Sequence, residues 1–336
     1  MFDIITIGGA TRDVFLFTEE LHSHKTKDAA TRVEACLPFG AKINIEEIHY
    51  DTGGGATNAA VTFSRLGKLR TGVLTRIGND SRGISVRNAL RADHVDTTLL
   101  QVTSKEHTAY SAILSPANMK GERTIMVYRG ASKHFEHGKI PWNKLKAKWF
   151  YISSLGGDIA LLKKIVAHAQ RIGAKIMFNP GSAELIKLSP TLKVRGGWEG
   201  LWQSLTFLLL NREEAVTLTG IRSEDTKELL RALMKITPSA IMTDGPKGAY
   251  AVYKGTGYYV PSVGHAPKNL TGAGDAFGSG FVTGWIKSNG DIKEALRVGS
   301  FNADSVVQHI GAKTGILRTY PTKKQLATLA VKEIKL

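Results

Sequence analysis

The stretch Thr271-Gly272-Ala273-Gly274-Asp275, with the residues 276–286 that follow it, decides the fold and the chemistry expected of this chain. Phe277, Phe281 and Trp285 recur every fourth residue, which predicts a helix with one buried stripe. Small residues let a ligand approach the backbone closely, and the unpaired N–H groups at a helix start attract an anion. The stretch therefore fits a phosphate cradle, and it fits equally well a helix that packs through its glycines.

Asp275 is the unusual member of this stretch, because a carboxylate repels a phosphate. Its position makes sense if it takes a proton from a hydroxyl group that attacks the phosphate. We therefore treat Asp275 as the candidate base, and Gly272, Ala273 and Gly274 as the candidate anion hole.

Composition limits the class of protein. The chain has 336 residues with 42% hydrophobic content, which is ample for one large α/β domain. The lone Cys36 excludes an internal disulfide and fits a reducing, cytoplasmic setting. The first residues are typical of a strand rather than of a basic leader, and no apolar run is long enough to span a membrane.

The charge of the chain favours an anionic ligand. A formal net charge of +16 suits a nucleotide, and it also raises the odds of nucleic acid. The Lys and Arg residues are scattered, however, and no basic run is interleaved with aromatic residues. A generally basic surface explains this pattern better than a nucleic-acid interface does.

A second glycine-rich turn, Gly53-Gly54-Gly55, opens a predicted helix that Gly67 can close. Asn58, in the first turn or so of that helix, carries a donor and an acceptor, a pair that suits a polyol better than a phosphate. A local cap is the alternative. Asp13 follows the predicted strand 2–8, where an acid often lines a site, although a turn-forming Asp explains it at least as well.

The order of strands and helices predicts an α/β fold with a small β-sheet lid. Short β-prone pieces at 14–17, 42–50, 108–114 and 123–128 are expected to form one sheet apart from the main one. From residue 71 strands and helices alternate, which implies parallel strands with right-handed crossovers. Residues 322–336 are expected to be a surface helix or tail. The other expected strands are 71–77, 149–153, 175–179, 206–210 and 240–243, and the helices are 83–92, 159–172, 212–219, 227–235 and 292–309.

Polar residues follow the strand 206–210. Asn211 and Glu214 lie three positions apart and could together hold water around Mg²⁺. The same spacing also fits an N-cap with a capping-box Glu, which is the better reading of these residues alone.

The loop after the next strand contains Thr243, Gly245 and Gly248 and could contact the phosphates or ribose of a nucleotide, or it could be an ordinary turn. Asn302, in the last long helix, could border an adenine slot or be solvated. Competing chemistries fail on spacing. The chain has no G-x-x-x-x-G-K-[ST] loop, no G-x-G-x-x-G after a strand and no His pairs with metal-ligand spacing.

Taken together, these motifs resemble the ribokinase-like (PfkB) carbohydrate kinase family over nearly the whole chain. The resemblance rests on the glycine-rich stretch 53–58, the N-x-x-E element at 211–214 and the G-A-G-D element at 272–275, in the family's order. It implies a single three-layer α/β/α domain over residues 1–336, with a mostly parallel central sheet and a lid formed by about 14–50 and 105–130.

The resemblance also implies ATP-dependent phosphorylation of a hydroxyl of a small sugar, ribose- or fructose-like, with Mg²⁺. Asp275 would then be the base, beside the anion hole of the G-A-G-D element. The expected contacts are Asp13, Gly54, Gly55 and Asn58 to the sugar, Asn211, Thr243, Gly245, Gly248 and Asn302 to the nucleotide, and Glu214 to magnesium through water.

One position departs from the family's pattern. Many members have Asp-Thr-Thr before the G-A-G-D element, and the first Asp often helps to hold a monovalent cation. Here the residues are Asn269-Leu270-Thr271, so that negative charge is missing. His309 lies in the second segment that would border the cation. Activation by potassium is therefore in question.

Several alternatives stay open at the level of sequence. The acceptor could be a nucleoside, with Tyr110 or Tyr128 over its base, or a keto-deoxy sugar acid, with Arg12 or Arg123 near the pocket. A non-catalytic protein that senses a nucleotide or binds nucleic acid is disfavoured by the intact Asp275 and the scattered basic residues. Because the lids of such kinases often pair, a homodimer through the lid is a further alternative to a monomer.

Overall fold

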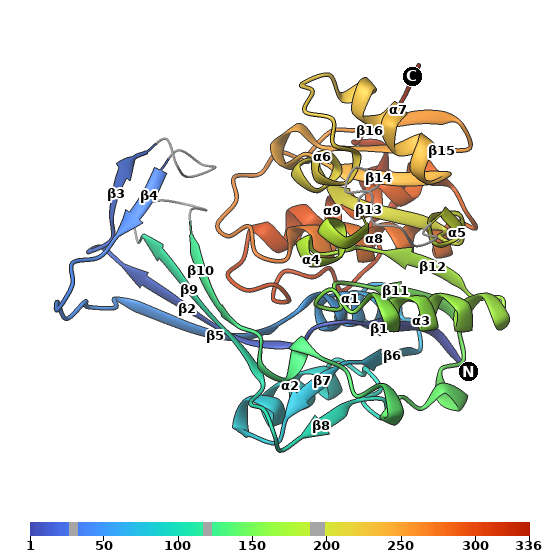
Figure 1. Ribbon diagram of the computed structural model, residues 1–336. Coiled ribbons are helices and arrows are strands. Elements are labelled where there is room, and N and C mark those ends of the chain that lie inside the picture. Colours follow the sequence, from blue (N-terminus) through green and yellow to red (C-terminus); the bar gives the residue numbers. More distant parts are fainter. Residues whose placement is uncertain (27–32, 117–122, 189–198) are drawn as a thin grey trace.

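The computed structural model describes residues 1–26, 33–116, 123–188 and 199–336 (Figure 1). Within these ranges the main sheet has nine strands, of which the central ones run parallel. Three antiparallel strands extend one edge. The expectation of a mostly parallel central sheet is confirmed. Its spatial order is β17 (Lys332–Ile334), β16 (Thr256–Val260), β15 (Ala249–Tyr253), β14 (Ser239–Thr243), β13 (Phe207–Asn211), β12 (Lys175–Phe178), β11 (Ala147–Ile152), β1 (Phe2–Ile7) and β6 (Thr71–Leu74).

Helices cover both faces of this sheet, which gives the expected three layers (Figure 1). One face is covered by α3 (Ile159–Arg171), α4 (Ser182–Leu188), α5 (Glu199–Gln203), α6 (Arg212–Thr219) and α7 (Thr226–Ile236). The other is covered by α1 (Gly55–Arg65), α8 (Ala273–Lys287) and α9 (Ile292–Val307). Two further helices, α2 (Ser81–Ala92) and α10 (Lys323–Ala327), lie beside α1 and α9.

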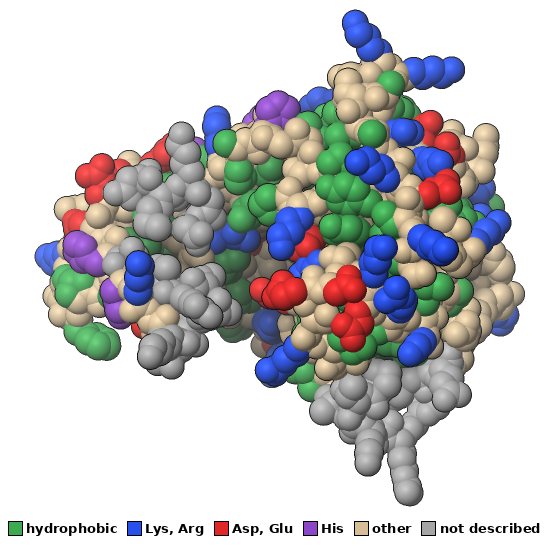
Figure 2. Space-filling view, turned by 90° about the horizontal axis from the view of Figure 1, so that it is seen from above, with side chains coloured by type: hydrophobic (Ala, Val, Ile, Leu, Met, Phe, Trp, Pro, Cys, Tyr) green, Lys and Arg blue, Asp and Glu red, His purple; other side chains and the backbone are tan. Residues whose placement is uncertain are grey.

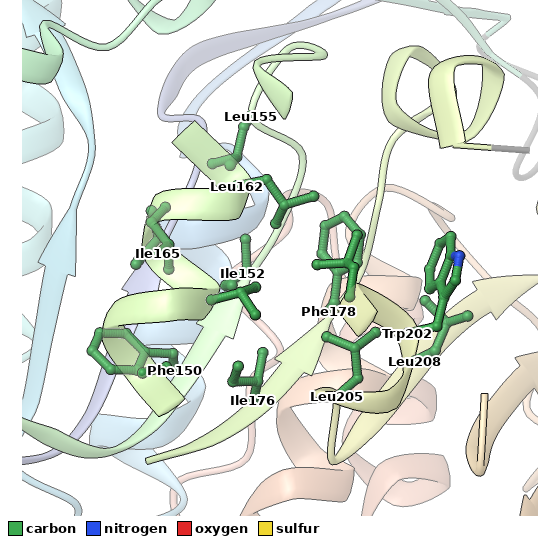
Figure 3. Close-up of a cluster of buried hydrophobic side chains, with 14 of the residues drawn as sticks. Phe150, Ile152, Leu155, Leu162, Ile165, Ile176, Phe178, Trp202, Leu205 and Leu208 are labelled. Carbon is green, nitrogen blue, oxygen red and sulfur yellow. The ribbon is translucent and has the colours of Figure 1, made fainter. Parts of the chain in front are cut away.

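Helix α3 shows how the first layer is held. Its apolar residues recur at helical spacing, and Leu162 and Ile165 are buried against side chains of β11 and β12 (Figure 3). Phe150 and Phe178 of these strands are fully buried in the same cluster. Each such side chain contributes about 1.5–3 kcal/mol relative to leaving it exposed.

The predicted stripe on α8 is confirmed and fixes where that helix begins. Phe281 and Trp285 pack edge-on against Phe207 of β13, with ring centroids 4.9 and 4.8 Å apart. Phe277 is buried in the same cluster. This packing holds α8 over β13 and places its first turn beside Asn211, at the carboxyl end of that strand.

The lid is a separate four-stranded sheet that projects from the main body (Figure 1). Its order is β10 (Thr124–Tyr128), β9 (Ala109–Pro116), β2 (Thr11–Thr18) and β5 (Glu47–Gly53), so the prediction of one small sheet is confirmed. The bounds of all four strands differ from expectation by a few residues; the largest differences are that β2 already begins at Thr11 and that residues 42–46 are not in a strand. Asp13 therefore lies on a lid strand and not in a turn.

Other expectations were wrong in detail. The predicted strand 71–77 is divided between β6 and β7 (Arg76–Gly78), and β7 pairs instead with β8 (Gln101–Thr103). The hairpin of β3 (His22–Lys25) and β4 (Val33–Cys36) was not predicted. Residues 322–336 are not simply a surface segment, because β17 joins the main sheet next to β16. Ile334 and Leu336 pack on the core there, and a strand this short leaves no periodic signal.

No helix in the described ranges is both long and apolar enough to cross a membrane. Lys and Arg side chains are spread over the main body in the face that Figure 2 shows, without forming one continuous stripe.

Candidate active site

Two helices that begin with glycine meet at the edge of the main sheet. Gly54 precedes α1 with φ of 96°, and a Cβ there would lie 2.4 Å from the carbonyl oxygen of Gly9. Gly272 precedes α8 with φ of 82°, and a Cβ there would lie 2.6 Å from the Cβ of Ala312. Only glycine fits such positions. Neither helix start has a side-chain cap, so backbone N–H groups are left for another partner.

Asp275, in the first turn of α8, joins these two helix starts. Its Oδ2 accepts a hydrogen bond from Nδ2 of Asn58 on α1, at 2.9 Å. Burial raises the pKa of Asp275, while the bond from Asn58 and the positive charge of Lys313 act in the opposite direction. The arrangement produces a poorly solvated carboxylate beside a helix start that attracts anions.

Three cavities lie in a row, and the second and third meet at this carboxylate. The first, of about 410 Å³, is lined by Thr243 at the end of β14, by residues of the connecting loops such as Gly245, by one face of α9 and by Ala273 and Gly274. The second, of about 190 Å³, shares Ala273 and Gly274 with the first. The third, of about 260 Å³, lies under the lid and shares Asn179, Glu214 and Asp275 with the second. A large ligand in the first cavity would thus reach a small ligand in the third past Asp275.

Most of the residues expected at the site line these cavities. Thr243, Gly245 and Gly248 line the first cavity, which we call the nucleotide cavity. Asn211, Glu214 and the stretch Gly272 to Asp275 line the second, the phosphate cavity. Gly54 and Gly55 line the third, the acceptor cavity.

The comparison with known proteins identifies the class of enzyme. A model of the pfkB family of carbohydrate kinases matches residues 3–319. The chain belongs to this family. This PfkB kinase is an ATP-dependent sugar or nucleoside kinase.

Its similarity to individual members is moderate in sequence and extends over most of the chain. It is 25% identical to ribokinase from Haemophilus influenzae over 279 residues, which cover 81% of this chain and 85% of the relative. It is 23% identical to nucleoside kinase from Methanothermobacter thermautotrophicus over 315 residues, 94% and 92% of the two chains. The solved structure of Arabidopsis thaliana ribokinase with ribose and ATP aligns with a TM-score of 0.72 at 18% identity, over 97% and 98% of the two chains. These neighbours confirm the fold.

Asp13 and Asn58, which we expected to contact the acceptor, lie just behind the acceptor cavity of this PfkB kinase. Each is only 4% exposed. Asp13 accepts a hydrogen bond from Oγ1 of Thr11, at 2.8 Å, and Thr11 itself lines the cavity. Burial raises the pKa of Asp13, although hydrogen bonds from Thr11 and Ser111 act against this. Asp13 is therefore connected to the cavity by its hydrogen bond with Thr11 and does not line it directly.

Asn302 does not lie where we expected it. It is fully buried, donates to the carbonyl oxygen of Ala276 at 2.8 Å and accepts from the N–H of Leu317 at 3.1 Å. These bonds tie α9 to α8. The α9 residues that do line the nucleotide cavity, Ser300, Ala303, Asp304 and Val307, occupy a different face of the helix.

The structure shows the capping-box reading of Asn211 and Glu214, and the place of Glu214 is compatible with the metal reading. Oε2 of Glu214 accepts from the N–H of Asn211, and Oδ1 of Asn211 accepts from the N–H of Glu214, both at 2.8 Å, which makes a complete capping box. Glu214 also lines two cavities. Burial, with the charges of Asp275 and Glu213, raises its pKa. Its Oε1 bonds to no described residue, so this carboxylate fits Mg²⁺ held through water.

The residues at the family's monovalent-cation position do not fit such an ion. Asn269 is buried, and its Oδ1 already accepts the N–H of Thr271 at 2.7 Å. The side chain of His309 bonds to the carbonyl oxygen of Ser305 at 2.9 Å. Neither supplies a negative charge, and we derive no step of the reaction from a monovalent cation.

Some site residues were missed. Ser153 and Asn179 directly follow β11 and β12 and line the acceptor cavity, so they could have been found from their places after strands. Ser132, Ser154 and Arg129 line it too, and no sequence signal marks them.

Four residues named for other acceptors do not line that cavity. Arg12 faces away from Asp13 and lies over the ring of Tyr50, at 5.4 Å. By strand register, Tyr110 and Tyr128 lie on the same face of the lid as Arg12. Arg123 does not line the cavity either.

Proposed function

We propose that this kinase transfers the γ-phosphoryl group of ATP to a hydroxyl of a small sugar of the ribose or fructose type. The observation that supports this is the place of Asp275, where the phosphate and acceptor cavities meet, in the first turn of a helix without a side-chain cap. Nothing else in the site combines a carboxylate with backbone donors in this way among the described residues.

In the proposed reaction Asp275 accepts the proton of the acceptor hydroxyl as its oxygen attacks the γ-phosphorus. A new P–O bond forms while the bond to the bridging oxygen breaks, and ADP leaves. The N–H groups at Gly272, Ala273 and Gly274 stabilise the negative charge that develops on the transferred group. Bound Mg²⁺ supplies further charge neutralisation on the phosphates, and Glu214 and Asn211 are the residues that would orient its water shell.

The acceptor cavity favours a polyol. Hydroxyl and amide groups of Ser132, Ser153, Ser154 and Asn179 line it, and these both donate and accept hydrogen bonds as sugar hydroxyls do. A sugar acid is the second candidate, because exposed Arg129 also lines the cavity and pairs with no described acid. A nucleoside is less favoured, since Tyr110 and Tyr128 lie on the opposite face of the lid.

The test is ADP release from ATP and Mg²⁺ with a panel of pentoses, hexoses, nucleosides and sugar acids, with and without potassium. We expect ADP release that depends on the presence of a simple sugar. ³¹P NMR should then show the phosphorylated form of that sugar. Preference for a keto-deoxy sugar acid that Arg129→Met abolishes would move the assignment to that class. ATP binding without ADP release on any acceptor would favour a nucleotide-sensing protein instead.

We also propose that the lid pairs with a second copy of the chain. Ile48, Tyr50, Met126 and Tyr128 are about half exposed, at 49, 59, 54 and 49%, and register places them on the face opposite Asp13. Exposed apolar residues on a sheet face favour a protein partner, and β10 exposes Ile125 and Val127 on the other face as well, at 41 and 52%. Sedimentation should show a dimer that the substitution Tyr50→Asp dissociates, and a wild-type monomer at micromolar concentration would contradict this.

A further inference from the structure

Lys313 is a buried ammonium group that the proposed reaction does not use. Its side chain is 4% exposed and belongs to the segment that follows α9. On one side of this segment Ala312 packs against Gly272 of the anion hole. On the other, a Cβ on Gly311 would lie 2.2 Å from Oδ2 of Asp51 on β5. The segment therefore touches both the phosphate cavity and the lid.

The hydrogen bonds of Lys313 link the lid to helix α1. Its Nζ donates to Oγ1 of Thr52 on β5, at 2.8 Å. Its carbonyl oxygen accepts from Nη1 of Arg65 on α1, at 2.6 Å. Arg65 in turn forms an ion pair with Asp93 at the end of α2, with Nη2 and Oδ2 at 2.8 Å.

Lys313 is surrounded by carboxylates, most of which have no cation of their own. Asp13 on β2, Asp51 on β5 and Asp93 face it, and its charge also acts on Asp275 of α8. Arg65, the other cation acting on Lys313, is already paired with Asp93. That leaves one ammonium group for the remaining three acids.

Asp13 and Asp51 are the pair that most needs this charge. They are direct partners across β2 and β5, so both side chains lie on the same face of the lid. Like charges in such a pair repel, and Oδ2 of Asp51 is buried without a hydrogen bond to the described residues. A nearby cation offsets this repulsion.

We infer that Lys313 is a positioning residue, whose ammonium group holds the lid strands β2 and β5 against the turn that carries the anion hole. This inference deepens the proposed function and rests on it for its kinetic test. Loss of the charge would leave Asp13, whose pKa burial already raises, without a counter-ion, and Asp13 would take up a proton more readily. A protonated Asp13 is a poorer acceptor for Thr11, which lines the acceptor cavity.

The pH behaviour of Lys313 gives this idea a measurable signature. Burial lowers the pKa of Lys313 to about 8, even though Asp51, Asp13 and Asp93 raise it and only Arg65 adds to the lowering. The ammonium group is therefore charged below about pH 8 and neutral above it. If the charge positions the acceptor, kcat/KM for the acceptor falls as pH rises through this value, since that ratio reports the free enzyme.

The experiment compares Lys313→Met, Lys313→Arg and the surface control Lys144→Met. We expect Lys313→Met to raise the acceptor KM roughly 10- to 100-fold, the scale on which misplaced groups act, with the ATP KM nearly unchanged. Its pH profile should lack the alkaline fall. Lys313→Arg should keep the low KM, and its alkaline fall should move to higher pH because guanidinium stays charged. Lys144→Met should behave as the wild type.

A second readout does not depend on activity. Amide hydrogen exchange in β5 should be faster in Lys313→Met than in the wild type or Lys144→Met, because the lid strand loses its anchor. Should Lys313→Met not fold, Thr52→Val removes the hydrogen-bond acceptor while keeping side-chain shape, and smaller changes in the same direction are expected. Unchanged exchange in β5 together with an unchanged acceptor KM would overturn the inference. If the wild type phosphorylated no acceptor, the proposed function would be rejected. The hydrogen-exchange result would still decide the role of Lys313.

Discussion

Eight of the described helices begin in two different ways, and the two that begin without a capping side chain are the ones that meet at Asp275. In the described helices α2, α3, α6, α7, α9 and α10, an Asp, Asn or Thr side chain caps the first turn. In α1 and α8 a glycine stands at that position and no side chain caps. Glycine in place of a capping side chain costs roughly a few tenths of a kcal/mol. The two helix starts that meet at Asp275 thus lack the stabilisation that a cap provides. A bound ligand can supply the missing hydrogen-bond partners there.

The largest effect should come from the acid that the uncapped start of α8 carries. Asp275→Asn keeps the shape of the side chain and removes the base, so kcat should fall roughly 10²–10⁴-fold. The fold should survive, because a buried carboxylate costs more than an amide. Turnover of saturated enzyme measures the first effect and the thermal midpoint the second. Near-normal turnover would remove Asp275 from the mechanism.

A smaller effect should follow from filling the space in front of that helix start. A Cβ on Gly274 would meet no other atom within 4 Å, and the φ of this residue is not left-handed, so alanine fits the fold there. Gly274→Ala should therefore keep or raise stability, by up to about 1 kcal/mol. It narrows the phosphate cavity, and kcat/KM for ATP should fall at least about tenfold, below the 10²–10³-fold cost of losing a donor.

The matched control for this variant is Gly200→Ala on α5, which is also a helical glycine in open space. It should change neither kinetic constant. Equal kinetics in the two variants would show that the start of α8 is an ordinary packed helix end.

The link between the two uncapped helices should set the acid limb of the pH profile. The hydrogen bond from Asn58 lowers the pKa of Asp275 against the effect of burial. Without it the carboxyl holds its proton to higher pH, and the base is lost earlier as pH falls. Asn58→Ala should thus move the acid limb of kcat/KM to higher pH, while Asn143→Ala, an exposed amide, should not. An unshifted limb would mean that Asn58 does not tune the base.

The smallest kinetic effect is expected at a capped helix. Asp291 accepts from the N–H groups of Lys293 and Glu294 at the start of α9, away from the cavities. Asp291→Ala should cost about 1 kcal/mol in the free energy of unfolding, as cap removal usually does, and leave kcat and both KM values unchanged. Urea unfolding and steady-state kinetics measure the two. A kinetic loss here would show that the contrast between capped and uncapped starts is not one of function.

Sequence patterns predicted those parts of the molecule that follow a local rule. The stripe of α8, the parallel strands and the small lid sheet all rest on periodicity or on the order of elements, and the structure confirms them. Asn302 was misplaced because residue type alone does not say which face of a helix meets a cavity. Arg129 and Lys313 had no signal at all, since one basic residue among 45 Lys and Arg is marked only by its surroundings.

The junction between β5 and α1 has a consequence for how the molecule can vary. The lid strand ends at Gly53 and the helix that carries Asn58 begins at Gly55, so a single residue separates them. The described residues 19–26 and 33–46, toward the far end of the same strands, make no part of that junction. Chain length can therefore change among them, where loops tolerate insertion, without moving the carboxylate of Asp275. Relatives whose lid tips are longer or shorter would then accept different acceptors, while the phosphoryl-transfer centre stays the same.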